Sequence, residues 1–277
     1  MSTSPRRLLA RAGVRPNKRF AQNFLENASA AREIAQLSLA GSPPAMPMLE
    51  IGAGTGALTA ALLEAGANLT AIEIDPQLVA LLCSRADLAR AEIVHADALA
   101  FDYRTWSQGR HWRAVGNLPY NVATPLMLRL IAMDGGPDCL TVMIQKDVAE
   151  RLAAVPGTSA YGSLSVAVQY AMRVERALTL PPRSFFPPPK VESSVVQLVR
   201  RTEAAARPRD LAMFWKVVRG AFAYRRKTLV NTLALALDLD RAKIVRALQL
   251  SDLSPELRGE RLDLADFARL ADALAEE

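Results

Sequence analysis

The stretch Glu50-Ile51-Gly52-Ala53-Gly54-Thr55-Gly56 decides the fold, because it joins a buried strand to a helix through closely spaced glycines. The apolar run Met48–Ile51 predicts the strand, and Ala57–Ala65 predicts a helix that ends at Gly66. Glycines at such a turn allow a tight bend and let a ligand approach the backbone. The stretch therefore predicts the first unit of a parallel sheet, with a small-molecule site at the strand end.

Outward from this turn, short apolar runs alternate with amphipathic helices as far as about Val199. Further strands are predicted at 68–74, 92–96, 113–116 and 140–144, and an antiparallel pair at 177–180 and 191–199. Beyond a linker at 201–210, only helical patterns follow, at 211–223, 227–237, 241–248 and 264–274. The predicted fold class is α/β, with a Rossmann-like sheet over 1–206, basic N-terminal arm included, and a small all-helical domain over 207–277.

The composition excludes several classes of protein. Of the 277 residues, 51% are hydrophobic, which excludes a disordered chain. No apolar run approaches the roughly 18 residues that a membrane-spanning helix needs. Two cysteines and two histidines, without a Cys-x-x-Cys pair, indicate neither a disulfide framework nor a zinc site. We therefore expect no metal, no membrane and a reducing, cytoplasmic compartment.

The net charge of +6 is concentrated in two basic clusters. Residues 1–25 contain five arginines and one lysine but no acid. Residues 200–230 contain nine arginines and lysines, and their only acids are Glu203 and Asp210. Clustered cations bind phosphate backbones because each neutralised phosphate releases condensed counterions. One such cluster would indicate a solvated surface, whereas two clusters around a ligand site favour a nucleic acid. We assign RNA binding to Arg225, Arg226 and Lys227.

Acidic residues end the second and third predicted strands. Glu73-Ile74-Asp75 follows the glycines by roughly 20 residues, where a carboxylate can hold both ribose hydroxyls. Asp97 could accept a hydrogen bond from an adenine amine. A dinucleotide fingerprint would need glycine at position 57, which is Ala57. S-adenosylmethionine carries no phosphate, so glycines with acids favour it over a nicotinamide cofactor, for which we expect no binding.

The fourth predicted strand runs into Asn117-Leu118-Pro119-Tyr120, a motif suited to a poorly nucleophilic amine. The nitrogen lone pair of an exocyclic adenine amine is delocalised into the ring. The Asn117 side-chain oxygen and the Leu118 carbonyl can accept its two hydrogens, while Pro119 fixes the backbone and Tyr120 offers a face for stacking. These residues therefore predict methyl transfer to adenine N6, without a general base.

The proline-rich loop Pro181–Val191 carries two aromatic residues, Phe185 and Phe186. A stiff loop beside a base pocket could clamp a flipped base from the side opposite Tyr120. The alternative is that the rings cap the core, which we favour for Phe186.

Taken together, the chain resembles the small-subunit ribosomal RNA adenine dimethyltransferase family over essentially its full length. The matching segments are 18–25, 50–56, 73–75, 97–98, 117–124, 145–151, 161–165, 187–191 and 222–229. The resemblance implies a Rossmann-like class I S-adenosylmethionine-dependent methyltransferase sheet followed by a helical RNA- or ribosome-binding domain. It also implies a cytoplasmic enzyme that places two methyls on N6 of each of two adjacent adenosines. These lie in the hairpin loop near the 3′ end of small-subunit rRNA, within an assembling subunit, and we assume a monomer.

The resemblance also implies roles for individual residues. The residues implied to hold the cofactor are Asn23, Leu25, Gly52, Glu73, Asp97 and Asn117. Tyr120 and Phe185 are implied to sandwich the target base. The chain departs from the family at Ala53, where proline is usual, and at Gly259, where a better helix former is usual.

Two alternatives stay open. The related erythromycin-resistance type modifies an adenine of large-subunit rRNA, although the Pro187–Lys190 loop and the segment 222–229 favour the small-subunit type. A ribosome-assembly factor could also keep the fold with catalysis secondary or lost. The intact Asn117–Tyr120 motif and the strand-end acids argue against loss of catalysis.

Overall fold

The computed structural model describes residues 4–17, 20–224 and 226–276, without the side chains of residues 120 and 121. The predicted roles of the Tyr120 ring and of Arg225 therefore lie outside the described residues. The chain divides into two compact units, Met1–Ala149 with Val174–Arg200 and Glu150–Arg173 with Arg201–Glu277. Each unit has its own hydrophobic core.

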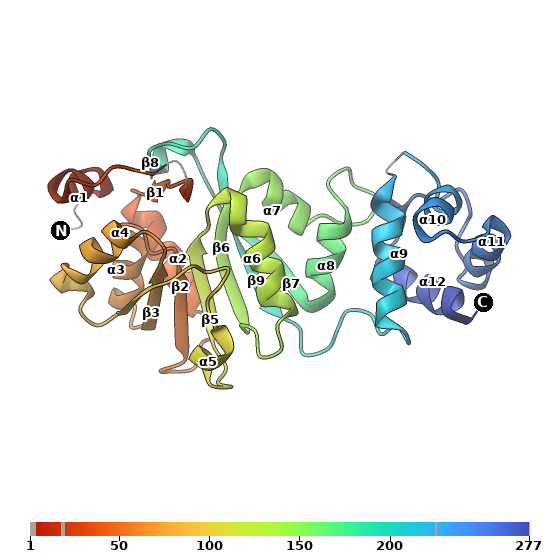
Figure 1. The fold of residues 1–277 in the computed structure, drawn as a ribbon, viewed down its shortest axis with the longest axis horizontal. Coiled ribbons are helices and arrows are strands. Elements are labelled where there is room, and N and C mark those ends of the chain that lie inside the picture. Colours follow the sequence, from red (N-terminus) through yellow and green to blue (C-terminus); the bar gives the residue numbers. More distant parts are fainter. Residues whose placement is uncertain (1–3, 18–19, 225, 277) are drawn as a thin grey trace. The chain divides into compact units, whose positions relative to one another are not determined.

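A seven-stranded sheet in the order β4-β3-β2-β5-β6-β9-β7 organises the first unit (Figure 1). Its strands are β2 (Pro47–Ile51), β3 (Asn68–Glu73), β4 (Glu92–His95), β5 (Arg113–Asn117), β6 (Cys139–Gln145), β7 (Met172–Leu180) and β9 (Ser193–Arg200). The five strands from β4 to β6 are parallel, and β9 runs antiparallel to β6. The predicted α/β class is confirmed. The strand order changes direction between β2 and β5, because β3 and β4 are added on one side of β2 and β5 and β6 on the other. Open parallel sheets bind ligands at such a point.

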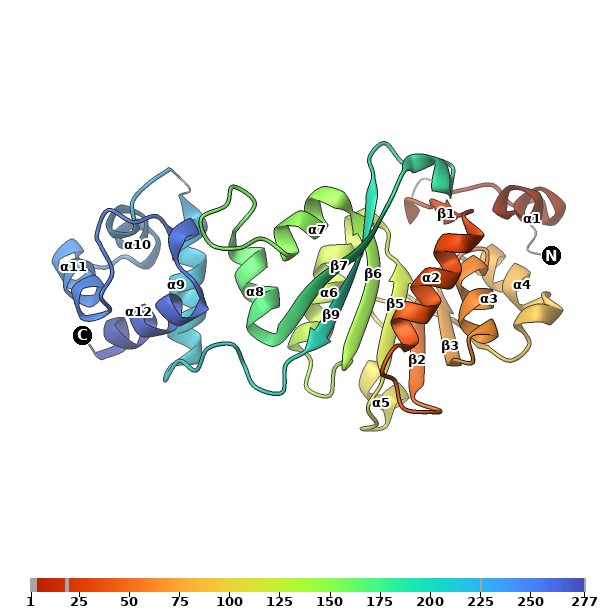
Figure 2. The same ribbon diagram turned by 180° about the vertical axis from the view of Figure 1, so that it is seen from behind.

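Helices cover both faces of this sheet. They are α2 (Ala28–Leu39), α3 (Ala57–Glu64), α4 (Pro76–Cys83), α5 (Tyr103–Ser107), α6 (Tyr120–Ala132) and α7 (Lys146–Leu152). Helix α6 lies in front of the sheet in Figure 1 and α2 lies in front of it in Figure 2, so these two helices cover opposite faces. The sequence analysis did not predict α2, although Asn27 caps it by accepting from Ser29 N and Ala30 N.

The N-terminal part of the chain forms two further elements that the sequence analysis did not predict. Helix α1 (Pro5–Ala12) packs Leu9 against Phe24 and Leu78. The short strand β1 (Phe24–Leu25) pairs antiparallel with β8 (Phe185–Phe186). Residues 5–12 of the basic N-terminal arm therefore form a helix, which an apolar contact holds against the rest of the first unit.

The second unit is built from helices α8 (Ser163–Ala171), α9 (Leu211–Ala223), α10 (Leu229–Leu237), α11 (Arg241–Leu250) and α12 (Leu264–Glu276). This division of the chain differs from the predicted domain boundary at 206/207, because residues 150–173 belong to the helical unit. Tyr161 and Val166 belong to the same core as Phe214 and Phe267, because the segment around α8 buries its apolar side chains against α9. The Tyr170 ring likewise lies 5.3 Å from the ring of Phe214.

Gly259 packs directly against helix α9. A Cβ at this position would lie 2.6 Å from the Ala221 carbonyl oxygen, which is backbone and cannot move aside. We predict that Gly259→Ala lowers the free energy of unfolding of the helical unit by about 1–3 kcal/mol, because the added methyl overpacks this contact. Thermal denaturation, with hydrogen exchange of the α9 amides, measures the loss.

The matched control is Gly162→Ala in the same unit, where a Cβ would meet nothing within 4 Å and φ is −167°. Gly162→Ala should lower the stability less than Gly259→Ala does, because it loses only the preference for glycine over alanine at the N-cap of α8. Equal losses in the two variants would contradict the packing explanation.

Candidate cofactor and target-base site

A cavity lies at the carboxyl ends of the parallel strands in the first unit. The turns after β2, β3, β4 and β5 line it, together with the N-terminal segment Phe20–Leu25 and helix α6. Of the residues predicted from sequence, the cavity brings together Asn23, Leu25, Gly52, Glu73, Asp97, Asn117 and Leu118. Parallel strands end at one edge of a sheet, so turns far apart in the sequence meet there.

The glycine turn after β2 adopts backbone conformations that favour glycine. Gly52, Gly54 and Gly56 have φ values of 77°, 58° and 80°. A Cβ on Gly56 would also lie 2.7 Å from Leu88 Cδ1. At Ala53, the N–H donates to the Ile72 carbonyl at 3.2 Å, a bond that proline cannot make. The turn is therefore fixed by its own backbone as well as by its neighbours.

Glu73 connects the glycine turn to the end of β3. Its Oε2 accepts from Gly54 N at 2.8 Å, and its Oε1 accepts from the N–H groups of Ile74 and Asp75 at 2.9 and 3.0 Å. The side chain is 5% exposed, and burial raises its pKa despite these bonds. The carboxylate is thus held rigidly against the cavity, and Oε2 keeps room for a second donor.

Glu50 is a buried carboxyl group in the cavity lining. It is 1% exposed, and its Oε2 has no hydrogen-bond partner among the described residues. Burial raises the pKa of Glu50 from an ordinary value of 4.5 to about 8. Interactions with Thr59 offset only part of this shift. A buried carboxylate oxygen without a partner fits a cationic donor, because such a ligand satisfies the oxygen and favours the ionised form.

Asp97 lies beyond the end of β4 and is exposed at the cavity. Its Oδ1 accepts from the N–H of Leu99 at 2.8 Å, which closes a tight turn and orients the carboxylate. Two exposed apolar side chains, Ile74 and Leu99, line the cavity beside it. This combination suits a flat aromatic ring, whose faces can contact the apolar side chains while a hydrogen-bond donor on its edge meets the Asp97 carboxylate.

Asn117 ends β5 and is held by a backbone carbonyl far away in the sequence. Its Nδ2 donates to the Asn23 carbonyl oxygen at 2.7 Å, so its Oδ1 is the end of the amide that stays available as an acceptor. The next residue, Leu118, is anchored because its N–H donates to the Met143 carbonyl at 3.1 Å. Both residues line the cavity.

The segment Phe20–Leu25 closes the cavity and contributes a residue that the sequence analysis did not single out. Gln22 donates from Nε2 to Asp75 Oδ2 at 2.9 Å. Its neighbour Ala21 has φ 48°, which is uncommon for a residue other than glycine. The signal in the sequence was that Gln22 is itself part of the segment 18–25 that resembles the family, and this did not reveal its partner Asp75.

The two phenylalanines of the proline-rich loop both pack against apolar side chains, and Phe185 does not lie where the resemblance implies. Phe185 is 3% exposed, belongs to the core of the first unit and is absent from the cavity lining. Phe186, which we expected to cap the core, is half-buried and packs against the cluster of Leu9, Phe24 and Leu78, with the Arg6 guanidinium 5.8 Å from its ring centre. Register explains the burial of Phe185, since it pairs with Leu25 and both side chains belong to the core of the first unit. The stacking role of Phe185 stays a prediction that requires its ring to become exposed.

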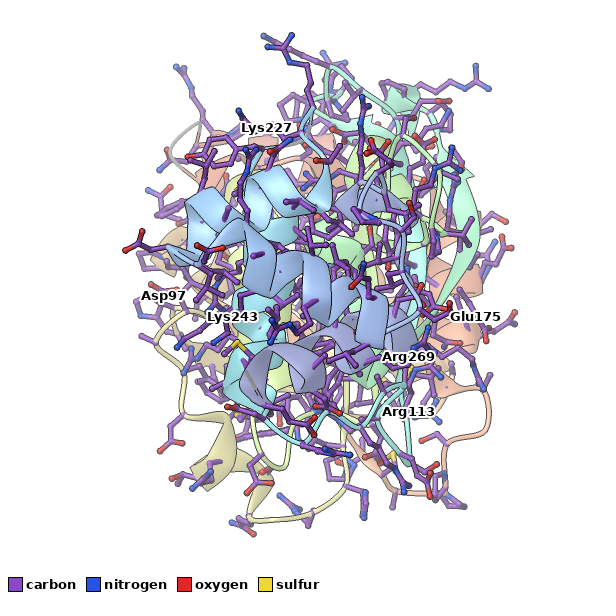
Figure 3. The ribbon with its side chains drawn as sticks, turned by 90° about the vertical axis from the view of Figure 1, so that its right-hand side faces the viewer. Asp97, Arg113, Glu175, Lys227, Lys243 and Arg269 are labelled. Atoms are coloured by element: carbon purple, nitrogen blue, oxygen red, sulfur yellow. The ribbon has the colours of Figure 1, made fainter. Side chains whose placement is uncertain are left out.

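The predicted RNA-binding residues that the structure describes, Arg226 and Lys227, are exposed in the second unit. The Lys227 Nζ lies 5.9 Å from the Tyr224 ring centre. Helix α10 begins at Leu229 rather than Lys227, because Thr228 takes the N-cap position. Figure 3, which faces the helical unit, labels Lys227 together with Lys243 of α11 and Arg269 of α12.

Two other kinds of site are absent from the described residues. The described part of the chain brings together no group of three or more His, Cys, Asp or Glu side chains that could hold a metal ion. Within the same residues, no helix is both long and apolar enough to cross a bilayer.

The sheet, the glycine turn and the acids at successive strand ends define a class I S-adenosylmethionine-dependent methyltransferase. The residues present fit this cofactor. Glu73 suits its ribose hydroxyls, Asp97 suits its adenine amine, and the unpartnered Glu50 oxygen suits a cation. The cofactor would supply an electrophilic methyl group on a sulfonium.

Within that class, the chain belongs to the ribosomal RNA adenine dimethylase family, whose sequence model matches residues 13–272. A relative from Pseudomonas aeruginosa, named ribosomal RNA small subunit methyltransferase A, is 43% identical over 264 residues, which cover 95% of this chain and 96% of the relative. A relative of the same name from Hahella chejuensis is 41% identical over 262 residues, or 94% of this chain and 93% of the relative.

Solved structures agree with this assignment. A dimethyladenosine transferase from Plasmodium falciparum superposes with a TM-score of 0.71 and is 25% identical, covering 89% of this chain and 95% of that one. The 23S rRNA methyltransferase ErmE superposes with a TM-score of 0.70 at 24% identity, covering 91% and 100%. At that identity, the second comparison supports the shared fold alone.

Proposed function

We propose that the protein is an rRNA adenine N6-dimethyltransferase. It transfers methyl groups from S-adenosylmethionine to N6 of two adjacent adenosines in the 3′-terminal hairpin loop of small-subunit rRNA, during ribosome assembly. The observation that carries the proposal is the Asn117 amide, whose Nδ2 is occupied by the Asn23 carbonyl so that Oδ1 is left as an acceptor at the cavity. The family and the names of its relatives support the choice of substrate.

The chain contributes positioning to this reaction. For the first transfer, Asn117 Oδ1 and the Leu118 carbonyl accept the two hydrogens of the N6 amine and aim its lone pair at the methyl group. The N–CH3 bond would form as the S–CH3 bond of the sulfonium breaks and leaves a neutral thioether. For the second transfer, the monomethylated amine has one hydrogen left for these acceptors. An amine bonded in this way becomes more pyramidal, which makes its lone pair more nucleophilic. The alkylated nitrogen then loses its proton to water, so no buried base is required. Precise orientation and fixed dipoles account for the rate gain.

The RNA partner is held by the basic surfaces. Arg6, Arg7 and Arg11 are exposed on α1, whose residue Leu9 packs against the cavity-lining residue Phe24. Arg226 and Lys227 are exposed in the helical unit, for which we propose an RNA- or ribosome-binding role. The physiological partner is then rRNA within the assembling small subunit, and we propose a cytoplasmic monomer that needs no metal.

Replacing Arg226 and Lys227 by glutamate, with Arg225 included, should weaken RNA binding and flatten its salt dependence. Each lost phosphate contact makes the negative slope of log K against log salt shallower by about 0.7–0.9. Filter binding of the rRNA hairpin at several salt concentrations gives the slope, and calorimetry should give an unchanged cofactor affinity. An unchanged slope would return these residues to an ordinary solvated surface.

The proposed substrate is tested by mapping methylated adenines in both rRNAs by primer extension, after incubation with purified small subunits, large subunits and naked rRNA. Reverse-transcription stops at two adjacent adenines near the 3′ end of small-subunit rRNA are expected. Modification confined to large-subunit rRNA would instead identify the erythromycin-resistance type. No modification of any RNA would favour an assembly factor without catalysis.

A further inference from the structure

A series of hydrogen bonds links the cofactor side of the cavity to Asn117 through Gln22. Gln22 Nε2 donates to Asp75 Oδ2 at 2.9 Å, and Gln22 Oε1 accepts from the N–H of Asn17 at 2.7 Å. Asp75 is 5% exposed, and its own N–H donates to Glu73 Oε1 at 3.0 Å. Both ends of the Gln22 amide are therefore engaged. Nε2 attaches the N-terminal segment to the strand end that carries Glu73, and Oε1 fixes the side chain within that segment.

The segment that Gln22 holds needs such support. Ala21, directly before it, has φ 48°, a conformation that residues other than glycine keep only where surrounding contacts enforce it. Asn23, directly after it, presents the carbonyl that accepts from Asn117 Nδ2 at 2.7 Å. Loss of the Gln22 contact therefore displaces the Asn23 carbonyl.

The Asn23 carbonyl decides which end of the Asn117 amide faces the target amine. A carbonyl only accepts, so it retains Nδ2 and leaves Oδ1 for the substrate. Without it, the amide can turn over and present N–H donors to an amine that is itself a donor. The reaction then loses its positioning acceptor, although Glu73 and Asp97 still hold the cofactor.

We propose that Gln22 is a positioning residue for methyl transfer. Through Asp75 and the Asn23 carbonyl, it keeps the Asn117 oxygen directed at the target amine. The inference rests on the proposed function, since that function assigns the acceptor role to Asn117. It adds a residue that acts through hydrogen bonds and makes no claim of contact between Gln22 and the RNA.

The first experiment compares Gln22→Ala with Gln36→Ala, an exposed glutamine on α2. Single-turnover methylation of small subunits at saturating cofactor should slow at least about 10-fold for Gln22→Ala, because a small misplacement of the acceptor is costly. The control variant should keep the wild-type rate. An unaltered rate in Gln22→Ala would overturn the inference.

The second experiment repeats Gln22→Ala in an Asn117→Asp background. Aspartate has two equivalent acceptor oxygens and no donor for the Asn23 carbonyl. This background is therefore slow, but the end of the side chain that faces the amine no longer depends on that carbonyl. The residual rate of Asn117→Asp should be unaffected by the added Gln22→Ala change. A role confined to stability would slow both backgrounds equally, and that result would overturn the inference.

A third experiment exchanges donor and acceptor across the contact. Gln22→Glu alone places two carboxylates together, and Asp75→Asn alone places two amide donors together, so each should slow transfer. The double variant Gln22→Glu/Asp75→Asn restores a donor–acceptor pair, and asparagine still caps α4. Recovery of most of the rate is expected, and a double variant as slow as the slower single would count against the contact.

The wild-type arm keeps this inference separable from the proposed function. If the wild-type protein leaves small-subunit adenines unmodified, the proposed function fails before any variant is compared. If the wild type methylates them and the Gln22 variants behave like the wild type, only the positioning role fails.

Discussion

Replacing Asn117 with alanine is expected to lower the rate of methyl transfer by about 10²–10³-fold, the range observed when one preorganised polar group is removed from an active site. The variant loses the Oδ1 acceptor that positions the amine, together with the bond to the Asn23 carbonyl. Single-turnover methylation of purified small subunits measures the rate. Cofactor binding should stay measurable by calorimetry, because Glu73 and Asp97 remain in place.

The control for this variant is Asn68→Ala. Asn68 begins β3 at the opposite end of the sheet, is exposed, and donates to the Ala45 carbonyl outside the cavity. The Asn68→Ala protein should methylate small subunits at the wild-type rate. A fully active Asn117→Ala protein would refute the amine-positioning mechanism, whereas an unfolded one would be recognised by its loss of cofactor binding.

Replacing Glu50 with glutamine is expected to remove a pH dependence of cofactor binding. Burial raises the pKa of Glu50 to about 8, so the free protein holds a proton there at pH 7. A bound cation favours the carboxylate, and binding then releases that proton. As the pH drops below 8, the wild-type affinity for the cofactor should weaken by up to about 10-fold per pH unit, relative to Glu50→Gln. Calorimetry in buffers of different ionisation enthalpy counts the released protons.

The difference between wild type and Glu50→Gln isolates this effect from titration of the cofactor itself. Glu64→Gln, at the exposed end of α3, serves as the matched control and should release protons as the wild type does. Equal proton release in the wild type and Glu50→Gln would show that Glu50 does not respond to the ligand.

The same group should also make the stability of the free protein depend on pH. Between pH 4.5 and about 8, the folded state keeps the Glu50 proton and the unfolded state does not. This contribution to stability is therefore complete below pH 4.5 and declines as the pH rises towards 8. Relative to Glu50→Gln, the decline should reach up to ~1.4 kcal/mol per pH unit.

Much of the first unit could be predicted from sequence, because its signals are local. The apolar runs of β2, β3, β5 and β6 and the glycines of the turn each depend on neighbours within a few residues. Pro76 at the start of α4 and Asp75 as its N-cap are signals of the same kind. Such signals locate strand ends, and parallel strands with crossover helices place those ends at one edge.

Other features needed the folded chain, because they depend on which distant segments meet. The burial of Phe185 depends on its register with Leu25, and the place of α8 depends on the apolar face of α9. The shift in the pKa of Glu50 requires complete burial, which a sequence does not report. These properties arise from packing between segments that no periodic pattern connects.

The sequence alone thus determined the class of fold, the cofactor turn and the identity of the target motif, since each depends on short-range chemistry. The orientation of the Asn117 amide was decided only by the tertiary structure. Its partner carbonyl lies 94 residues away, in a segment held in place by Gln22 and Asp75. A hydrogen bond over that separation exists only after the sheet has formed and the N-terminal segment has closed over its edge.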